Sequence, residues 1–71
     1  MKLGSSKWVI FNKAFQIVLS KISQAVEGSN QIHTVINGYK VTIRFRLNNG
    51  VIQSFDIFMG WATRIIGKLL K

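Results

Sequence analysis

The chain has 71 residues, 48% of them hydrophobic, and carries ten lysines and arginines against two acidic residues, a net charge of +8. This length predicts a single small domain over residues 1–71, which buries roughly 60% of the surface that the unfolded chain exposes. The absence of cysteine excludes disulfides, and one histidine with two acids is too few for a protein-only metal cage, so we expect no metal and no cofactor.

The N-terminal third predicts a helix over about residues 6–27. Ser5 or Ser6 can cap its start, and Gly28 suits the left-handed position after its end. Apolar residues recur along one side at helical spacing: Trp8, Phe11, Phe15, Val18, Ile22 and Ala25. We therefore expect this helix to be buried over much of its circumference, with its tryptophan in the core.

Three strands are predicted next, at about residues 31–36, 39–47 and 51–59. Asn37-Gly38 is the strongest short-range signal of a two-residue hairpin turn. A second turn of three residues is expected at Asn48-Asn49-Gly50. The expected strand partners are Ile36 with Tyr39, His33 with Thr42, Leu47 with Val51, and Thr42 with Asp56.

Strict alternation over residues 39–47 separates the two faces of this meander, because successive strand side chains point to opposite sides. The inner face is predicted to carry Tyr39, Val41, Ile43, Phe45, Leu47, Val51, Phe55, Ile57 and Met59, with Gln53 as its one polar exception. The outer face is predicted to carry His33, Val35, Lys40, Thr42, Arg44, Arg46, Ile52, Asp56 and Phe58.

After Gly60, the spacing of the apolar residues predicts a second helix over about residues 61–70, with Trp61 in the core. The predicted fold class is therefore α+β. Its element order is α-β-β-β-α, a three-stranded antiparallel meander with both helices packed on one face. The outer face of the sheet is expected to be open to solvent.

This order of elements resembles the double-stranded RNA-binding fold and the small ribonuclease toxins of the HicA type. The resemblance covers most of the chain as an order of elements. Asn37-Gly38 stands in place of the RNA-binding family's Gly-Pro-x-His loop, and Trp61-Ala62-Thr63-Arg64 in place of its lysine cluster. Gly28-Ser29-Asn30 lacks the histidine of the toxin family. The resemblance therefore implies a fold and carries over no functional residue.

The predicted outer face suggests how the protein acts. Its cations recur at two- and four-residue intervals, and neighbours two residues apart lie roughly 6.6 Å from each other, near the phosphate spacing of a nucleic-acid strand. Arginine suits phosphate oxygens or guanine edges, and an aromatic ring can stack on an unpaired base. We hypothesise a non-enzymatic nucleic-acid-binding module, for DNA or RNA. The predicted contact residues are Lys40, Arg44, Arg46, Thr42, Phe58, Arg64 and Lys68, with Lys71 as a further candidate.

Alternatives stay open at this point. Val35, Ile52 and Phe58 add apolar side chains to the outer face, as is typical of an interface. The chain could then be a homodimer, or a phage- or plasmid-type inhibitor that binds an acidic host protein. We expect no enzyme, and the remote alternative is a ribonuclease toxin. It would use His33 together with an arginine of the outer face. His33 and Asp56 are predicted to lie on that face, one on each side of Thr42. The cationic, amphipathic helix expected at residues 61–71 leaves surface membrane binding open.

No segment predicts secretion or a membrane span. The apolar stretch Trp8–Phe11 is interrupted by Asn12 and Lys13. It is shorter than the roughly 7–15 apolar residues of a signal peptide or the roughly 20 of a spanning helix. We therefore expect a soluble, cytoplasmic protein.

Overall fold

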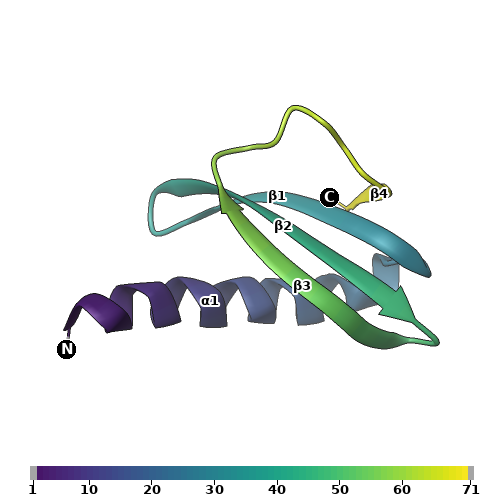
Figure 1. Cartoon of the computed structure of the whole chain (residues 1–71), viewed down its shortest axis with the longest axis horizontal. Coiled ribbons are helices and arrows are strands. Elements are labelled where there is room, and N and C mark those ends of the chain that lie inside the picture. The colour runs from purple at the N-terminus through teal and green to yellow at the C-terminus, as the bar shows by residue number, and fades with distance from the viewer. Residues whose placement is uncertain (1, 71) are drawn as a thin grey trace.

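The computed structural model describes residues 2–70, with side chains from Trp8 onward. One helix, α1 (Lys2–Lys21), ends in a 3₁₀ turn, η1 (Ile22–Gln24). The four strands are β1 (Gly28–Ile36), β2 (Tyr39–Asn48), β3 (Val51–Met59) and β4 (Lys68–Leu70). They form one sheet in the order β3-β2-β1-β4, with α1 along one face and the segment between β3 and β4 passing over the other (Figure 1).

The expected two-helix meander is wrong at its C-terminal end. Residues 61–70 form no helix, and Gly60 and Gly67 have φ angles of 83° and 79°, which a right-handed helix does not contain. Residues 60–67, the crossover segment, instead return across the outer face to β4. This strand pairs parallel with β1 and makes the sheet mixed, with Leu70 opposite Ile32. The resemblance to the two RNA-related families rested on the α-β-β-β-α order and is overturned with it.

The first helix is shifted toward the N-terminus relative to the predicted range of 6–27. It begins at Lys2, and its regular part ends at Lys21. Asn30 explains why the chain leaves the helix early: its side-chain amide accepts a hydrogen bond from the Val26 N–H (2.9 Å) and donates one to the Val26 carbonyl (2.8 Å). These contacts hold the chain in a turn that leads into β1, and Gly28 (φ 93°) opens that strand instead of ending a helix.

The first hairpin is confirmed. Asn37 and Gly38 have φ angles of 52° and 82°, the two positive values that a type I′ turn requires. Ile36 lies opposite Tyr39, and the pairing of His33 with Thr42 is as predicted. The left-handed preference of this dipeptide is thus enough to set the register of β1 and β2.

The second hairpin differs from its prediction. Its turn has two residues, Asn49 and Gly50 (φ 54° and 78°), so Asn48 lies opposite Val51. A β-bulge then shifts the register between Arg46 and Leu47. The observed partners are Leu47 with Ile52, Arg46 with Ser54, Arg44 with Asp56, and Thr42 with Phe58.

The bulge decides which side chains of β3 face the core. Gln53 is the extra residue and is exposed, so it is not an inner-face residue. Ile52, expected outside, packs against the core, whereas Val51, expected inside, is 65% exposed. In an unbroken strand Gln53 would have been a polar residue on the apolar inner face, and the bulge places it in solvent instead.

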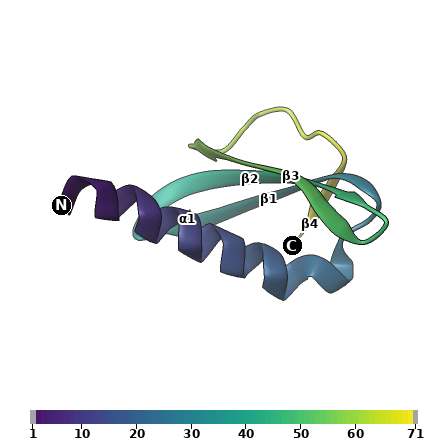
Figure 2. The ribbon, with the colours of Figure 1, turned by 60° about the horizontal axis from the view of Figure 1, so that its bottom comes forward.

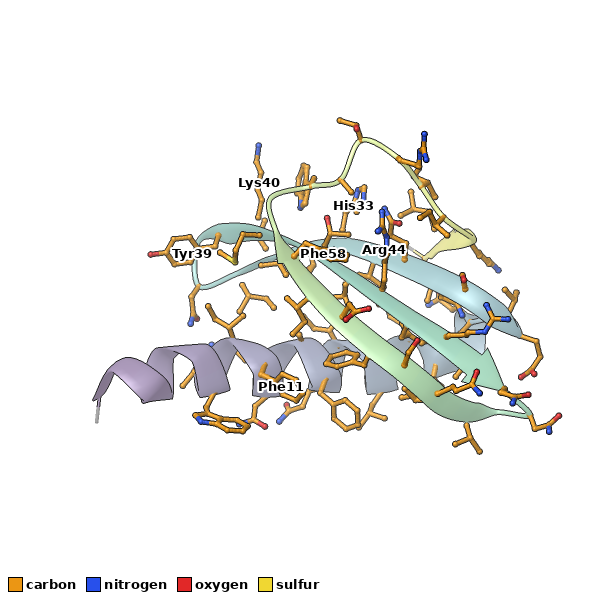
Figure 3. The ribbon with its side chains drawn as sticks, in the orientation of Figure 1. Phe11, His33, Tyr39, Lys40, Arg44 and Phe58 are labelled. Carbon is orange, nitrogen blue, oxygen red and sulfur yellow. The ribbon has the colours of Figure 1, made fainter. Side chains whose placement is uncertain are left out.

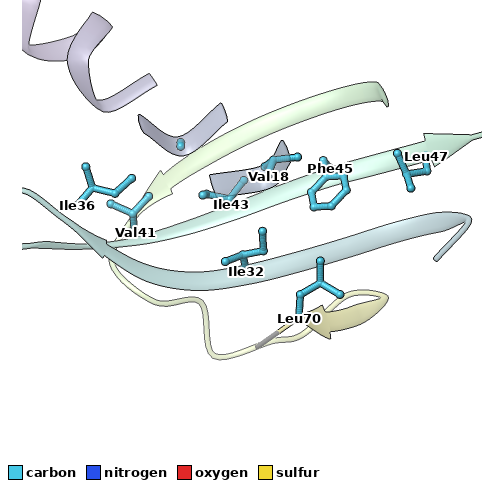
Figure 4. Close-up of a cluster of buried hydrophobic side chains, with 9 residues drawn as sticks. Val18, Ile32, Ile36, Val41, Ile43, Phe45, Leu47 and Leu70 are labelled. Atoms are coloured by element: carbon cyan, nitrogen blue, oxygen red, sulfur yellow. The ribbon is translucent and has the colours of Figure 1, made fainter. Parts of the chain in front are cut away.

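The core lies between α1 and the inner face of the sheet (Figures 2 and 4). Ala14 and Val18 of α1 are fully buried there. The whole buried cluster is Ala14, Val18, Ile32, Ile36, Val41, Ile43, Phe45, Leu47 and Leu70. The expectation that both tryptophans lie in the core is wrong, because Trp8 is 66% and Trp61 46% exposed. A small sheet covered by one helix cannot enclose every apolar side chain of this sequence.

Glu27 fastens the far end of the β2–β3 hairpin to the start of β1. Its carboxylate accepts hydrogen bonds from the backbone N–H groups of Asn49 (2.7 Å) and Gly50 (2.9 Å). The bond from Gly50, followed by that from Asn49, lowers the pKa of Glu27 below its ordinary value, because both bonds favour the charged carboxylate.

Replacing Gly67 by alanine is expected to destabilise the protein more than replacing Gly60. Both glycines have positive φ, which costs an L-residue roughly 1–2 kcal/mol. A Cβ on Gly67 would in addition collide with the backbone carbonyl of Ser29, whereas one on Gly60 meets nothing within 4 Å. Urea denaturation of Gly67→Ala and Gly60→Ala measures the difference, and equal losses would contradict the close approach of the crossover segment to β1.

Protonation of Glu27 is expected to weaken the fold in acid. A carboxyl whose native pKa is lowered contributes stability above its unfolded pKa of about 4.3, and this is lost as the pH falls through the lower native value. Thermal unfolding between the neutral and acid range should therefore show a smaller loss of Tm in Glu27→Gln than in the wild type. If Tm fell equally with pH in the two proteins, the hydrogen bonds of Glu27 to the β2–β3 turn would not contribute to stability.

Candidate nucleic-acid interface

The outer face is not the open surface that the alternation of β2 predicted, because the crossover segment lies over it (Figure 1). Figure 3 shows His33, Lys40 and Arg44 on the side of the sheet that faces this segment, with Phe11 on the opposite side. The candidate site is therefore built from two layers, the outer side chains of the sheet and the backbone that crosses them.

Gln31 joins these layers. Its fully buried side-chain oxygen accepts hydrogen bonds from Arg44 Nε (2.9 Å) and from the Ile66 N–H (3.1 Å). Its nitrogen donates to the Arg64 carbonyl (3.2 Å) and lies 2.8 Å from His33 Nε2. A primary amide offers two donors and two acceptor positions, and all four are used here. The sequence pattern of the predicted strand 31–36 gave no signal of this role.

The same contacts identify the tautomer of His33. The Gln31 oxygen faces two donors, so its NH₂ group must be the atom that points at His33 Nε2, which then accepts and leaves the proton on Nδ1. The imidazole stacks on Trp61 with ring centroids 6.1 Å apart, and the indole N–H donates to the Thr34 carbonyl (2.9 Å).

The predicted neighbourhood of His33 is wrong in one respect. Asp56 was expected opposite Thr42, which would have brought its carboxylate near the imidazole. The second hairpin instead places Phe58 opposite Thr42 and moves Asp56 next to Arg44. The histidine–aspartate neighbourhood that would serve acid–base chemistry is therefore not formed by this register.

Thr42, one of the predicted contact residues, is fully buried. Its hydroxyl donates to the Gly60 carbonyl (2.8 Å) and accepts from the Ala62 N–H (2.9 Å). It lies on the outer face, as the alternation predicts, but the start of the crossover segment covers it. Thr42 therefore anchors this segment and cannot itself reach a ligand.

Arg44 is half-buried and held in place. Besides its bond to Gln31, its Nη2 donates to the Arg64 carbonyl (3.3 Å), and its guanidinium carbon lies 4.9 Å from the centroid of the Phe58 ring. Two of its five N–H donors are used in these contacts. The Phe58 side chain is 41% exposed, so the arginine and this ring form an oriented pair at the surface.

Lys40 and Arg46 are exposed at the two ends of this arrangement. Lys40 Nζ lies 4.9 Å from the centroid of the Trp61 ring. Arg46 Nη1 lies 3.5 Å from the Ser29 hydroxyl, beside a hollow of about 150 Å³ that Arg44 and Asp56 also line. Asp56 is the acidic side chain of this side, since the other acid of the chain is at the β2–β3 turn.

The three C-terminal cations that were predicted as contact residues do not lie on one surface. Arg64 is exposed on the crossover segment and joins the outer side. Lys68 is the strand partner of Asn30, which is an inner-face position, so Lys68 does not belong to the cations of the outer face. Lys71 lies outside the described residues. We call Lys40, Arg44, Arg46, Arg64 and Phe58 the outer basic surface.

Comparison with known proteins gives no match. No protein-family model, no curated protein and no solved structure matches the chain.

Within residues 2–70, no three side chains of histidine, cysteine, aspartate or glutamate come together as a metal site. Over the same range, no helix combines the length and apolar character needed to cross a membrane. The amphipathic C-terminal helix that left membrane binding open is not formed.

Removal of the Gln31 amide is expected to release the crossover segment. Gln31→Leu keeps side-chain bulk but leaves Arg44 Nε and the Ile66 N–H without their acceptor. Trypsin should then cut after Arg64 roughly tenfold faster, because losing buried hydrogen bonds of this kind costs about 1 kcal/mol or more each. Mass spectrometry of the released C-terminal peptide measures the rate.

The matched control is Gln53→Leu, which makes the same chemical change at the exposed bulge of β3. It should leave the cleavage rate after Arg64 unchanged. Equal rates in both variants and the wild type would show that Gln31 does not hold the segment.

Proposed function

We propose that the protein is a non-enzymatic nucleic-acid-binding module that uses the outer basic surface. The observation that carries the proposal is the charge there: Lys40, Arg44, Arg46 and Arg64 accompany one acid, Asp56. A cation excess of this size on one side of a small domain attracts a polyanion. Nucleic acid is the commonest polyanion and the one whose charge spacing suits side chains on a strand.

The outer basic surface combines fixed and mobile cations. Arg44 is oriented by Gln31 and the Arg64 carbonyl, so its remaining N–H groups would meet a phosphate with little loss of side-chain freedom. Lys40 and Arg46 are exposed and can follow the backbone of the ligand on either side. Lys40 and Arg46 supply affinity through charge, and Arg44 supplies position.

Phe58 supports a preference for unpaired strands. Its ring is 41% exposed next to the Arg44 guanidinium, and an aromatic face beside a cation is the usual platform for a splayed base. Such a platform accepts bases of either DNA or RNA. We therefore propose single-stranded nucleic acid as the ligand, without selection by sugar.

Binding is expected to depend strongly on salt and on the outer cations. Fluorescence anisotropy of a labelled single-stranded oligonucleotide should give a linear fall of log affinity with log salt. The double variant Lys40→Gln with Arg46→Gln should reduce that slope by roughly 1.4, since each phosphate contact on a single strand contributes about 0.7.

Lys13→Gln with Lys68→Gln is the matched control. It removes the same two positive charges from sites outside the outer basic surface, on α1 and at the inner side of β4. If affinity fell equally in both double variants, only bulk charge would be at work. If the wild type did not bind at low salt, the proposal would be wrong.

A protein partner is the second candidate, and one observation favours it. Trp61, Ile65 and Ile66 of the crossover segment are 46%, 49% and 42% exposed, beside the outer cations. This mixture of apolar and basic side chains suits an acidic protein surface, as for an inhibitor of phage or plasmid type. A nuclease-resistant complex with one acidic protein, lost in Ile65→Ser but kept in Val51→Ser, would favour this candidate over nucleic acid.

A further inference from the structure

A second surface, on the opposite side of the molecule, is apolar. We call it the α1/β3 surface and define it by Trp8, Phe11, Phe15, Leu19, Phe55, Ile57 and Met59. Its rings form a continuous series, with centroids 6.1 Å apart for Trp8 and Phe11, 5.2 Å for Phe11 and Phe55, and 5.6 Å for Phe15 and Phe55. Trp8 is 66%, Leu19 50% and Met59 61% exposed.

This surface stays open because α1 does not cover the sheet evenly. The polar side of the helix lies toward β1, where Lys13 Nζ donates to the Asn37 side chain at the β1–β2 turn (2.8 Å). On the side toward β3, the helix leaves an apolar hollow of about 350 Å³ lined by Ile10, Phe11, Ile57 and Met59.

β3 is an edge strand, with β2 as its neighbour in the sheet. The Gly60 N–H donates to the Lys40 carbonyl (2.7 Å), and this bond sets the alternation of the antiparallel ladder. Phe55, Ile57 and Met59 therefore occupy the positions whose backbone N–H and C=O groups point away from β2. An edge of this kind is a template for another strand.

Among the side chains that the structure describes, from Trp8 onward, no charged group lies on the α1/β3 surface. The cations of α1 that follow Trp8 are Lys13, directed toward the β1–β2 turn, and Lys21, on another side of the helix from Phe15. On β3 the single charged residue is Asp56, whose side chain is on the outer face. Although the chain has a net charge of +8, the inner side of β3 carries no charged residue.

We propose that the α1/β3 surface binds a second copy of this chain in a twofold-symmetric dimer. β3 pairs antiparallel with β3 of the partner about Ile57, so that Phe55 lies opposite Met59 of the partner subunit. This register uses the outward backbone groups of all three residues and keeps like charges apart, since Asp56 falls opposite an aromatic ring. The two helices then meet along Phe15 and Leu19.

The area available is in the range that a small dimer needs. Aromatic side chains carry about 150–250 Å² each, so the exposed fractions of Trp8, Phe11 and Phe15 leave roughly 300 Å² to bury. Leu19, Met59 and nine residues of strand edge add to this, toward the roughly 800 Å² per partner of standard interfaces. The proposal is independent of nucleic-acid binding, which uses the other side of the sheet.

The first test is molar mass in solution. Light scattering of nuclease-treated protein at high salt, across the micromolar range, should give twice the monomer mass of 8.1 kDa. Trp8→Lys with Met59→Lys should raise the dimer Kd at least roughly thirtyfold, the weight of one interface hot spot. Both side chains are exposed, so the folded monomer should survive, as circular dichroism can verify.

Val35→Lys with Ile65→Lys is the matched control, because it places two lysines at exposed apolar sites away from the α1/β3 surface. It should leave the dimer intact. A wild type that stays monomeric throughout would overturn the proposal. So would monomers that bind vesicles of anionic lipid through Trp8, since the membrane would then be the occupant.

The second test addresses the register. The chain has no cysteine, so Ile57→Cys introduces a single thiol at the proposed twofold axis. Mild oxidation or a short bismaleimide should link most of the protein into a covalent dimer. Val35→Cys under the same conditions should stay unlinked. A dimer by mass that links equally well, or equally poorly, at both positions would contradict pairing through β3.

Discussion

The buried amide of Gln31 is the interaction on which the outer side of this protein depends. It binds Arg44 from β2, the backbone of Arg64 and Ile66 from the crossover segment, and His33 from its own strand. Because every donor and acceptor of the amide is used, neither a carboxylate nor an aliphatic side chain can replace it without leaving a buried polar group unpaired. Gln31 therefore sets both the orientation of Arg44 and the path of the crossover segment at Arg64 and Ile66, while Thr42 anchors the start of that segment.

Local signals in the sequence were sufficient where one dipeptide or one period decides the structure. Asn37-Gly38 specified the first hairpin and its register, and the alternation along β2 placed Val41, Ile43, Phe45 and Leu47 in the core. It was wrong for Tyr39, which is 57% exposed, and it could not show that Thr42 is buried under the crossover segment. The register of the second hairpin could not be predicted in this way, because Asn48-Asn49-Gly50 is compatible with two- and three-residue turns. The structure has the two-residue turn, and the bulge at Gln53 then shifts the register of β3 by one residue. Strand periodicity alone contains no information on an inserted residue.

The C-terminal segment shows why the remaining structure could not be predicted. Trp61, Ile65 and Leu69 have helical spacing, but the competing state is stabilised by contacts with residues about thirty positions away, such as Thr34 and Gln31. Gly60 and Gly67 were the available warning, since both adopt left-handed backbone angles. The cations of the candidate site were identified from β2, whereas the buried residues that position them emerge only from tertiary structure.

The two edges of the sheet are unequal, and this limits how copies of the chain can associate. β3 offers nine residues at one edge, whereas β4, at the other, has three residues and begins with a lysine. Strand addition is therefore more favourable at β3 than at β4. If two β3 edges pair, the longest free edge of each copy is covered. The short β4 and the part of β1 beyond its pairing with β4 then remain for further strand addition, which disfavours growth into a fibre although almost half of the sequence is hydrophobic.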